Sequence, residues 1–281
     1  MSSIRSAPHV QTPSVLARSR FLAIEGQPLF LCEWQNVLFI HYQINPAILQ
    51  SHVPFELELF AGTALISLVA FTMQRFRPRR GGRLTEWLFL PIATNSFFNV
   101  RTYVRHAGES GTYFMSQWLS HPLCALGHLP NLRLPWHWGR MVYEPAHQFG
   151  RVTDRLGGSS GTKLSYTTHL PPDASLAPAA PGSLAEFAME RYTAFALCHG
   201  NEVVFRVWHA PWPQCAVNIE IQDHGLLAQS GDWYRHARFA GANYTTGCSE
   251  VWMGRVTPIQ PNRKTRRGSS HGISRTFFEM P

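Results

Sequence analysis

The chain has 281 residues, enough for one large domain or two modest ones with a substantial core. Hydrophobic residues make up 44% of the chain and charged residues only 15%, which excludes a wholly disordered protein and a charged coiled coil. Basic residues outnumber acidic ones by 25 to 17, but only two of them are lysines, Lys163 and Lys264. Any reaction that needs a lysine amine therefore has two candidate residues in the whole chain.

Much of the net charge of +8 lies near the two ends of the chain. Residues 1–28 are polar, contain Arg5, Arg18 and Arg20, and are interrupted by prolines, so we expect a disordered N-terminal tail there. A basic cluster near the other end predicts a flexible C-terminal tail over residues 259–281. A single domain is expected between the tails, over residues 29–258.

The charge and cysteine patterns also limit the partners and the compartment. No aromatic RNA-binding signature and no recognition-helix pattern accompanies the basic residues, so nucleic acid is not an expected partner. The five cysteines are scattered and no two form a C-x-x-C pair, as expected of a reduced, cytoplasmic protein. No apolar run approaches the roughly 18 residues of a membrane span, so a membrane is not an expected partner either.

The first half of the chain reads as strands separated by short breaks. Asn45 and Pro46 precede a short helix predicted over residues 47–52, which ends before Pro54. Arginine, proline and glycine predict an exposed loop over residues 75–83. Apolar and alternating segments predict strands over residues 37–44, 63–71, 97–104 and 112–119.

The second half continues the same way, with one clear helix. A helix predicted over residues 122–132 is weakened by an internal glycine and proline. Ser183, with Glu186 three residues later, has the spacing of a capping box and predicts a helix that begins there. Many strands and few helices predict one α+β domain built on a barrel-like or cone-like sheet. The further predicted strands cover residues 140–143, 163–169, 202–209, 216–222 and 249–256.

Two patterns that often mark catalysis have plainer explanations here. Gly157-Gly-Ser-Ser-Gly161 matches G-x-S-x-G, but its polar flanks are typical of a hairpin turn and not of a nucleophile elbow. The chain has 14 histidines, yet no H-E-x-x-H and no Cys/His cluster with ligand spacing. We therefore expect neither a metal site nor a cofactor.

The strand over residues 97–104 carries the most informative pattern. Period-two alternation places Asn99, Arg101 and Tyr103 on one face of this strand. An arginine among apolar neighbours must be paired, either with an internal acid or with the carboxylate or oxyanion of a ligand. In the second interpretation Asn99 and Tyr103 complete the binding site. The candidate acids of the first are Glu33, Glu190 and Glu220.

Several short segments carry a family resemblance. The most specific is Asn99-Val-Arg-Thr-Tyr-Val104. Others, in matching order, are Val37-Leu-Phe-Ile-His-Tyr42, Val53-Pro-Phe-Glu-Leu57, Gly111-Thr-Tyr-Phe114, Leu134-Pro-Trp136 and His209-Ala-Pro-Trp-Pro213. Over roughly residues 33–256 the chain resembles the YqjF-like family of uncharacterised bacterial proteins. That family is similar in fold to acetoacetate decarboxylase, so the resemblance implies an α+β fold: an antiparallel, cone-like β-barrel around a cavity, with helices packed outside.

Two departures limit what this resemblance implies. Acetoacetate decarboxylase works through a Schiff-base lysine, whereas the corresponding stretch here, roughly residues 129–141, contains no lysine. Lys163 lies in a Gly/Ser-rich turn and Lys264 in the basic tail, so neither suits a desolvated amine, and Schiff-base decarboxylation is not expected. Relatives also carry an acid after the Tyr-Phe strand, where this chain has Ser116-Gln-Trp-Leu119.

The sequence therefore favours a protein that binds a carboxylate- or carbonyl-bearing metabolite in the cavity. Arg101, Asn99 and Tyr103 are the predicted ligand-binding residues. The alternative is a lysine-independent lyase or hydratase, in which Arg101 polarises the substrate and His41 or Glu190 carries a proton. His41 lies in an apolar strand, where a hydrogen-bonded core histidine is the competing interpretation. The predicted partner is a small-molecule ligand, and assembly into a homo-oligomer is compatible with the sequence.

Overall fold

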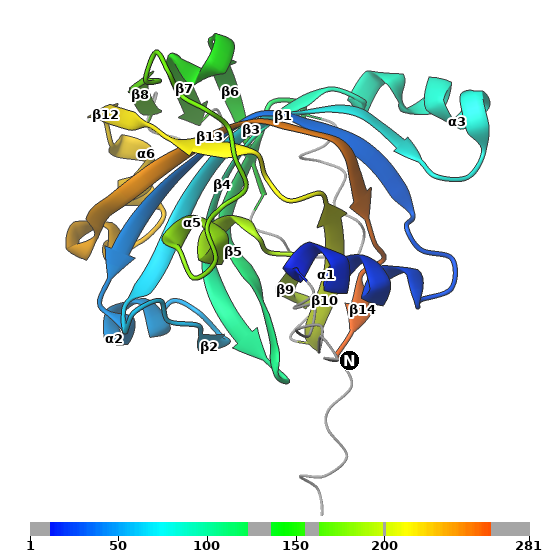
Figure 1. Ribbon diagram of the computed structural model, residues 1–281, viewed down its shortest axis with the longest axis horizontal. Helices are drawn as coiled ribbons and strands as arrows, with labels where there is room; N and C mark the ends of the chain where they lie inside the picture. The colour runs from blue at the N-terminus through cyan, green and yellow to red at the C-terminus, as the bar shows by residue number, and fades with distance from the viewer. Residues whose placement is uncertain (1–11, 123–135, 155–162, 199–200, 260–281) are drawn as a thin grey trace, which may run out of the picture.

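The computed structural model describes residues 12–122, 136–154, 163–198 and 201–259 (Figure 1). Strands dominate these residues, and the helices are few and short. The strands are β1 (Phe30–Ile44), β2 (Glu56–Leu57), β3 (Ala64–Pro78), β4 (Asn95–His106), β5 (Glu109–Leu119), β6 (Trp136–Tyr143), β7 (Phe149–Asp154), β8 (Lys163–His169), β9 (Thr193–Cys198), β10 (Asn201–His209), β11 (Gln214–Ala216), β12 (Asn218–Asp223), β13 (Arg238–Met253) and β14 (Thr257–Pro258). The helices are α1 (Pro13–Leu22), α2 (Pro46–Gln50), α3 (Gly82–Phe89), α5 (Leu184–Met189) and α6 (Gly225–Gln229), with short 3-10 turns η1 (Leu90–Ile92), η2 (Pro145–His147) and η3 (Asp232–His236).

The central feature of the fold is a sheet whose pairings close into a ring. Strand β1 pairs with β3, β3 with β4, β4 with β5, and β5 with β9. Strand β9 then pairs with β10, β10 with β13, and β13 again with β1. The pairing of β5 with β9, from Thr112 to Tyr113, is parallel and is the exception at this seam. The remaining pairings of the ring are antiparallel, as expected.

A second layer of strands extends from the other half of β5. Strand β6 pairs with β5 in parallel over Gln117–Leu119, and β7, β8 and β12 follow in antiparallel order. The main core lies between this layer and the outer face of the ring, where Phe98 and Trp118 pack with Leu164 and Tyr166. A register shift between Val100 and Arg101 separates the two halves of β5.

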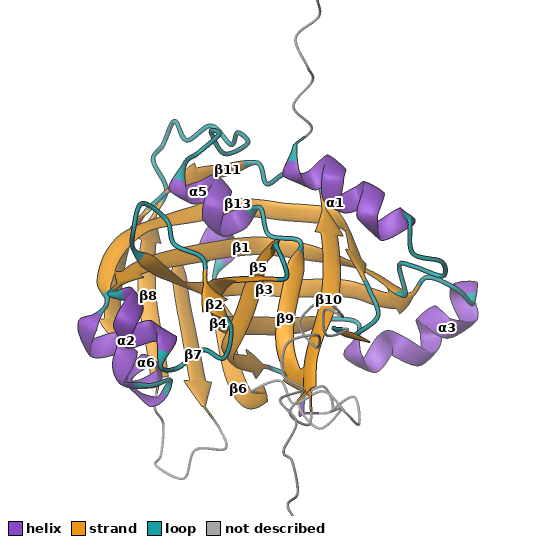
Figure 2. Ribbon diagram, turned by 90° about the horizontal axis from the view of Figure 1, so that it is seen from below, coloured by secondary structure: helices purple, strands orange, loops and turns teal. Residues whose placement is uncertain are grey.

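The helices lie at the margins of the sheet. In Figure 2, α2 and α6 lie together at one end of the molecule, and α1 and α3 lie at the other. Helix α5 begins as predicted, because the Ser183 hydroxyl accepts a hydrogen bond from the Glu186 N–H at 3.2 Å. The Glu186 carboxylate reaches back to the N–H of Gly182 at 2.6 Å. Among the described residues, no helix is long and apolar enough to cross a membrane.

Helix α1 corrects the prediction of a disordered N-terminal tail over residues 1–28. Pro13 starts this helix, since the first turn tolerates a residue without an N–H, and the prolines here are not only chain breakers. Phe21 is fully buried, and the Ser14 hydroxyl donates to the carbonyl of His209 at 2.8 Å. The helix is therefore packed on β10 (Figure 1), while residues 1–11 and 260–281 lie outside the described part of the chain.

Other differences from the predicted elements have simple causes. Strand β3 continues to Pro78 and α3 follows it, so the predicted loop over residues 75–83 is wrong. Arg75 pairs with Glu33 of β1 at 2.9 Å, and Arg79 donates to the carbonyl oxygen of Gln27, so these arginines have partners and do not require an exposed loop. Strand β13 is much longer than the predicted strand over residues 249–256. Most of the helix predicted over residues 122–132 lies outside the described residues, as does the G-x-S-x-G segment, whose flanking strands β7 and β8 form an antiparallel pair.

Candidate functional site

The predicted site residues of β4 share the inner face of the ring. Phe98, Val100 and Val104 pack in the core between the layers, so Asn99, Arg101 and Tyr103 point to the opposite side. Phe114, opposite Arg101 on β5, stacks on Phe205 of β10 with ring centroids 6.2 Å apart, although these two strands do not pair. The two rings meet over the single intervening strand β9, as side chains do on the concave side of a closed sheet, which places this face inside the ring.

Arg101 is not paired with an acid. Its Nη2 donates to the carbonyl oxygen of Ala188 in α5 at 2.8 Å, and its guanidinium lies 5.3 Å from the ring centroid of Phe39. None of the three candidate acids of the ion-pair interpretation forms a salt bridge with it: Glu33 pairs with Arg75, Glu190 bonds to Trp212 and Tyr192, and Glu220 is exposed. Among the described residues, Arg101 therefore keeps an uncompensated positive charge inside the ring.

Three buried polar atoms on this face have no hydrogen-bond partner in the described part of the chain. They are Oδ1 of Asn99, Nε of Arg101 and Nε2 of Gln117. Asn99 is only 5% exposed and Gln117 only 6%, and the two lie opposite each other on β4 and β5. Buried polar groups are normally satisfied, so such a group of atoms indicates a place for a polar molecule. We call Asn99, Arg101 and Gln117 the polar cluster.

A chain of hydrogen bonds crosses the inner face next to the polar cluster. Asn243 donates to Gln214 at 2.6 Å, so its oxygen is free to accept from Nε2 of His41 at 3.2 Å. Nδ1 of His41 then accepts from the Ser67 hydroxyl at 2.7 Å. The Tyr103 hydroxyl lies 2.5 Å from the Ser67 oxygen and 3.1 Å from the carbonyl oxygen of Ala188. These hydrogen bonds join the side chains of five neighbouring strands, in the order β4, β3, β1, β13 and β11.

Both histidines nearest Arg101 are electrically neutral. Burial, aided by the positive charge of Arg101, lowers the pKa of His41 to about 3, although the hydrogen bond with Asn243 opposes this. Burial also lowers the pKa of His209 to about 4, although its bond to the Ala210 carbonyl opposes this and Arg101 adds to it. His41 uses both ring nitrogens in the hydrogen-bond chain, which suits a positioning residue better than a proton carrier.

Glu190 lies apart from Arg101, on a surface cleft. This cleft, between α1 and α5, has a volume of about 600 Å³ and is also lined by Phe187 and Arg191. The Glu190 carboxylate accepts from the Trp212 N–H at 3.0 Å and from the Tyr192 hydroxyl. Burial raises its pKa, and these two hydrogen bonds partly oppose the rise. The structure therefore brings His41, Arg101, Asn99 and Tyr103 together, but not Glu190.

The lysine and cysteine side chains that the structure describes lie outside the polar cluster. Lys163 is half exposed and pairs with Asp223 at 3.5 Å. Among the described residues, Cys32, Cys215 and Cys248 are free thiols. Within the described residues, no group of histidine, cysteine and acidic side chains is suited to hold a metal ion.

Sequence reasoning missed Gln117, Ser67 and Asn243. Ser67 is the one polar side chain within the apolar first part of β3 and lies opposite both His41 and Arg101. Gln117 belongs to the segment that departs from the family pattern. Both signals were visible in the sequence, but the pairing of the strands was needed to connect them. Trp136 of β6 lies opposite Gln117, so the start of β6 borders the polar cluster.

Solved structures define the class of the fold. The enduracididine biosynthesis enzyme MppR, with HEPES buffer bound, matches with a TM-score of 0.57 and 14% identity over 83% of this chain and 88% of that chain. Acetoacetate decarboxylase from Legionella pneumophila matches with a TM-score of 0.55 and 11% identity over 91% of this chain and 98% of that chain. The chain has an acetoacetate decarboxylase-like fold, and at these identities the likeness concerns the fold alone.

Sequence comparison identifies the family within this class. Residues 32–238 match DUF2071, described as an uncharacterized conserved protein, and the chain belongs to this family. The uncharacterized protein YqjF of Bacillus subtilis (strain 168) is 27% identical over 216 residues, which cover 72% of this chain and 84% of YqjF. The resemblance carried by the short sequence segments is thereby confirmed.

Proposed function

We propose that this protein binds a small molecule with a carboxylate or carbonyl group at the polar cluster. The observation that carries the proposal is the set of unpartnered buried atoms at Asn99, Arg101 and Gln117. Nε of Arg101 and Nε2 of Gln117 are donors, and a carboxylate or carbonyl oxygen would accept from both. A fold neighbour, MppR, forms a complex with pyruvate, which has both groups.

The electrostatics of the inner face support an anionic ligand. Arg101 has no carboxylate partner in the described part of the chain, and the neutral histidines beside it neither add to its charge nor oppose it. An unpaired guanidinium in an enclosed site is costly, and a bound anion offsets that cost. The Ala188 carbonyl and the Phe39 ring hold the guanidinium in place before a ligand arrives.

Helix α5 lies between the polar cluster and the cleft that it forms with α1. A ligand could therefore reach the inner face from this cleft by passing α5. Phe187 lines that cleft, and its ring centroid lies 5.1 Å from that of Tyr103. The carbonyl oxygen of the next residue, Ala188, accepts a hydrogen bond from Arg101. A small shift of α5 would therefore connect the cleft with the inner face. We infer that ligands enter past Phe187.

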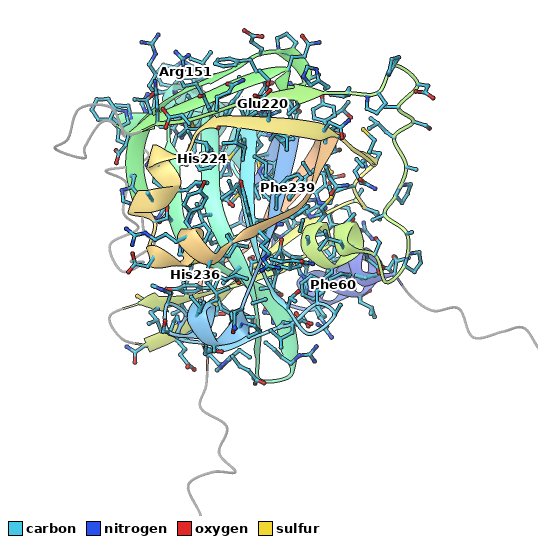
Figure 3. The ribbon with its side chains drawn as sticks, turned by 90° about the vertical axis from the view of Figure 1, so that its left-hand side faces the viewer. Phe60, Arg151, Glu220, His224, His236 and Phe239 are labelled. Carbon is cyan, nitrogen blue, oxygen red and sulfur yellow. The ribbon has the colours of Figure 1, made fainter. Side chains whose placement is uncertain are left out.

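Thermal unfolding with pyruvate, acetoacetate and acetate tests the proposal. A ligand at ten times its Kd should raise the Tm of the wild type by about 3 °C. Arg101→Gln should abolish this rise, because it removes the charge but keeps much of the side-chain volume. Arg151→Gln is the matched control: Arg151 is exposed on the outer layer (Figure 3) and should leave the rise unchanged. Equal responses of wild type and Arg101→Gln, or no response to any of the three probes, would contradict the proposal.

The alternative of a lysine-independent lyase or hydratase has less support. It needs a proton carrier beside Arg101, and His41 is neutral, buried and bonded through both nitrogens. Glu190 has a raised pKa but lines the cleft on the far side of α5. A binding function therefore fits this geometry better. A cytoplasmic location and assembly into a homo-oligomer stay predictions.

A further inference from the structure

A second cleft lies on the opposite side of the sheet from the polar cluster. It has a volume of about 470 Å³ and lies where β1, β12, η3 and β13 meet. Figure 3 faces this side of the molecule and labels Glu220 on β12, His224 just before α6 and Phe239 on β13. We call it the aromatic cleft. Its lining residues are Tyr42, Ile219, Ile221, His224, Tyr234, Arg235, Ala237 and Phe239.

Three aromatic rings form the walls of the aromatic cleft. Tyr42 meets Tyr234 with ring centroids 6.5 Å apart and planes at 76°, and meets Phe239 at 6.1 Å and 79°. Phe239 is 53% exposed, which is unusual for a large apolar side chain beside a cavity. Ile219 and Ile221 add aliphatic surface from β12. The faces and edges of these rings suit a flat, apolar body.

The polar side chains of the aromatic cleft form no hydrogen bond or ion pair with the other described residues. Tyr42 is only 6% exposed, yet no other described residue forms a hydrogen bond with its hydroxyl or with that of Tyr234. Arg235 stands at the rim and forms no salt bridge within the described residues, and His224 lies beside Tyr234 at 5.6 Å. No lining residue is acidic. A ligand with a negative group on its apolar body would therefore meet Arg235 without opposition.

We propose that the aromatic cleft is a second binding site, for a small aromatic molecule with an anionic group. Tyr42, Tyr234 and Phe239 would contact its ring system, and Arg235 would bind its anionic group. The site is separate from the polar cluster, because Tyr42 and His41 are successive residues of β1 and point to opposite faces of the sheet. A short carboxylate such as pyruvate has no ring and would gain little there.

Two fluorescent probes with the same ring system test this proposal by titration. Anilinonaphthalene sulfonate has the anionic group, and phenylnaphthylamine lacks it. Phe239→Ala should weaken binding of both probes about fivefold, through loss of the aromatic contact. Arg235→Gln should weaken the sulfonate about threefold and leave phenylnaphthylamine unchanged, since Arg235 is exposed and its ion pair is partly screened.

Two controls separate the aromatic cleft from other apolar surface. Trp87 of α3 is 69% exposed at the far end of the molecule, and Trp87→Ala should leave both affinities unchanged. Arg101→Gln should also leave them unchanged, which distinguishes this site from the polar cluster. Absence of sulfonate binding by the wild type would overturn the proposal. Equal probe affinities of the wild type and Phe239→Ala would also overturn it, as would a loss of probe affinity in Trp87→Ala alone.

Discussion

His41 and Tyr42 are adjacent in β1, but their side chains enter two different environments. On the inner face, His41 uses both ring nitrogens, and Ser67 and Asn243 continue its hydrogen bonds across the sheet. On the outer face, Tyr42 is surrounded by aromatic edges and its hydroxyl has no partner among the described residues. One strand therefore separates a polar region, crossed by side-chain hydrogen bonds, from an aromatic, partly open one.

The two regions are stabilised by different interactions. The inner face depends on hydrogen-bond geometry, so removing one member leaves its buried neighbours unsatisfied. The aromatic cleft depends on ring contacts that a ligand could share, and its rim is exposed. We therefore expect inner substitutions to change stability, and outer substitutions to change affinity for apolar probes with little effect on stability.

The largest expected effect is a loss of stability on acidification. Histidines of the unfolded chain titrate near 6.5, whereas burial lowers the folded pKa of His41 to about 3 and those of His209 and His147 to about 4. Below pH 6.5 the unfolded state binds more protons, so stability is complete above that pH and falls as the pH approaches 4. Together the three residues should give a slope of about 4 kcal/mol per pH unit.

Urea unfolding between pH 6 and pH 5 measures this slope, and unfolding at pH 7.5 gives the stability that is present before the histidines of the unfolded chain bind protons. His209→Phe keeps an aromatic ring among its aromatic neighbours and should reduce the slope by about 1.4 kcal/mol per pH unit. Trp87→Ala removes an exposed side chain that carries no titratable group and should leave the slope unchanged. Equal slopes for the wild type and His209→Phe would show that His209 is not held neutral by burial.

The second effect is the loss of the central histidine. His41→Ala should lower the free energy of unfolding by about 4 kcal/mol at pH 7.5, because it leaves a cavity and removes the partners of Ser67 and Asn243. The same change at the outer histidine, His224→Ala, should cost less than about 0.5 kcal/mol. Chemical denaturation of both variants checks the difference, and similar costs would contradict the proposed contrast between the faces.

The smallest effect compares one hydroxyl on each face. Tyr103→Phe removes the group that lies 2.5 Å from Ser67, and should cost about 1.5 kcal/mol. Tyr234→Phe removes a hydroxyl with no described partner, and should change stability by less than about 0.5 kcal/mol. The urea midpoints of the two variants and the wild type, measured under the same conditions, test this difference. A larger cost for Tyr234→Phe would mean that the outer hydroxyl has a structural role.

The sequence predicted the strands whose pattern is local. Strand β8 is found where the sequence predicts it, and β4 has the predicted alternation. Strand β9 was missed, because Thr193–Cys198 is short and follows the capped helix directly. Helix α3 was missed because Gly81 and Gly82 read as a loop. Its Gly81 adopts a φ of 109°, a left-handed conformation that suits glycine before a helix.

The candidate site was only half visible in the sequence. Alternation on one strand was enough to place Asn99, Arg101 and Tyr103 on a shared face. The position of Gln117 opposite Asn99, and of Ser67 opposite His41, depends on strand register, which tertiary pairing decides. The absence of an acid beside Arg101 likewise depends on contacts between distant segments. The sequence supplied the anion-binding hypothesis, and the structure removed its main competitor.

The parallel seam of β5 has a consequence for how the chain folds. Thr112 pairs with Ala194, so the ring closes only after segments far apart in the sequence have met. Loop-closure entropy and high contact order make such closure slow. Until β9 arrives, that half of β5 is a bare strand edge, which can pair with another chain. Refolding yield should therefore fall as protein concentration rises, even where the finished fold is stable.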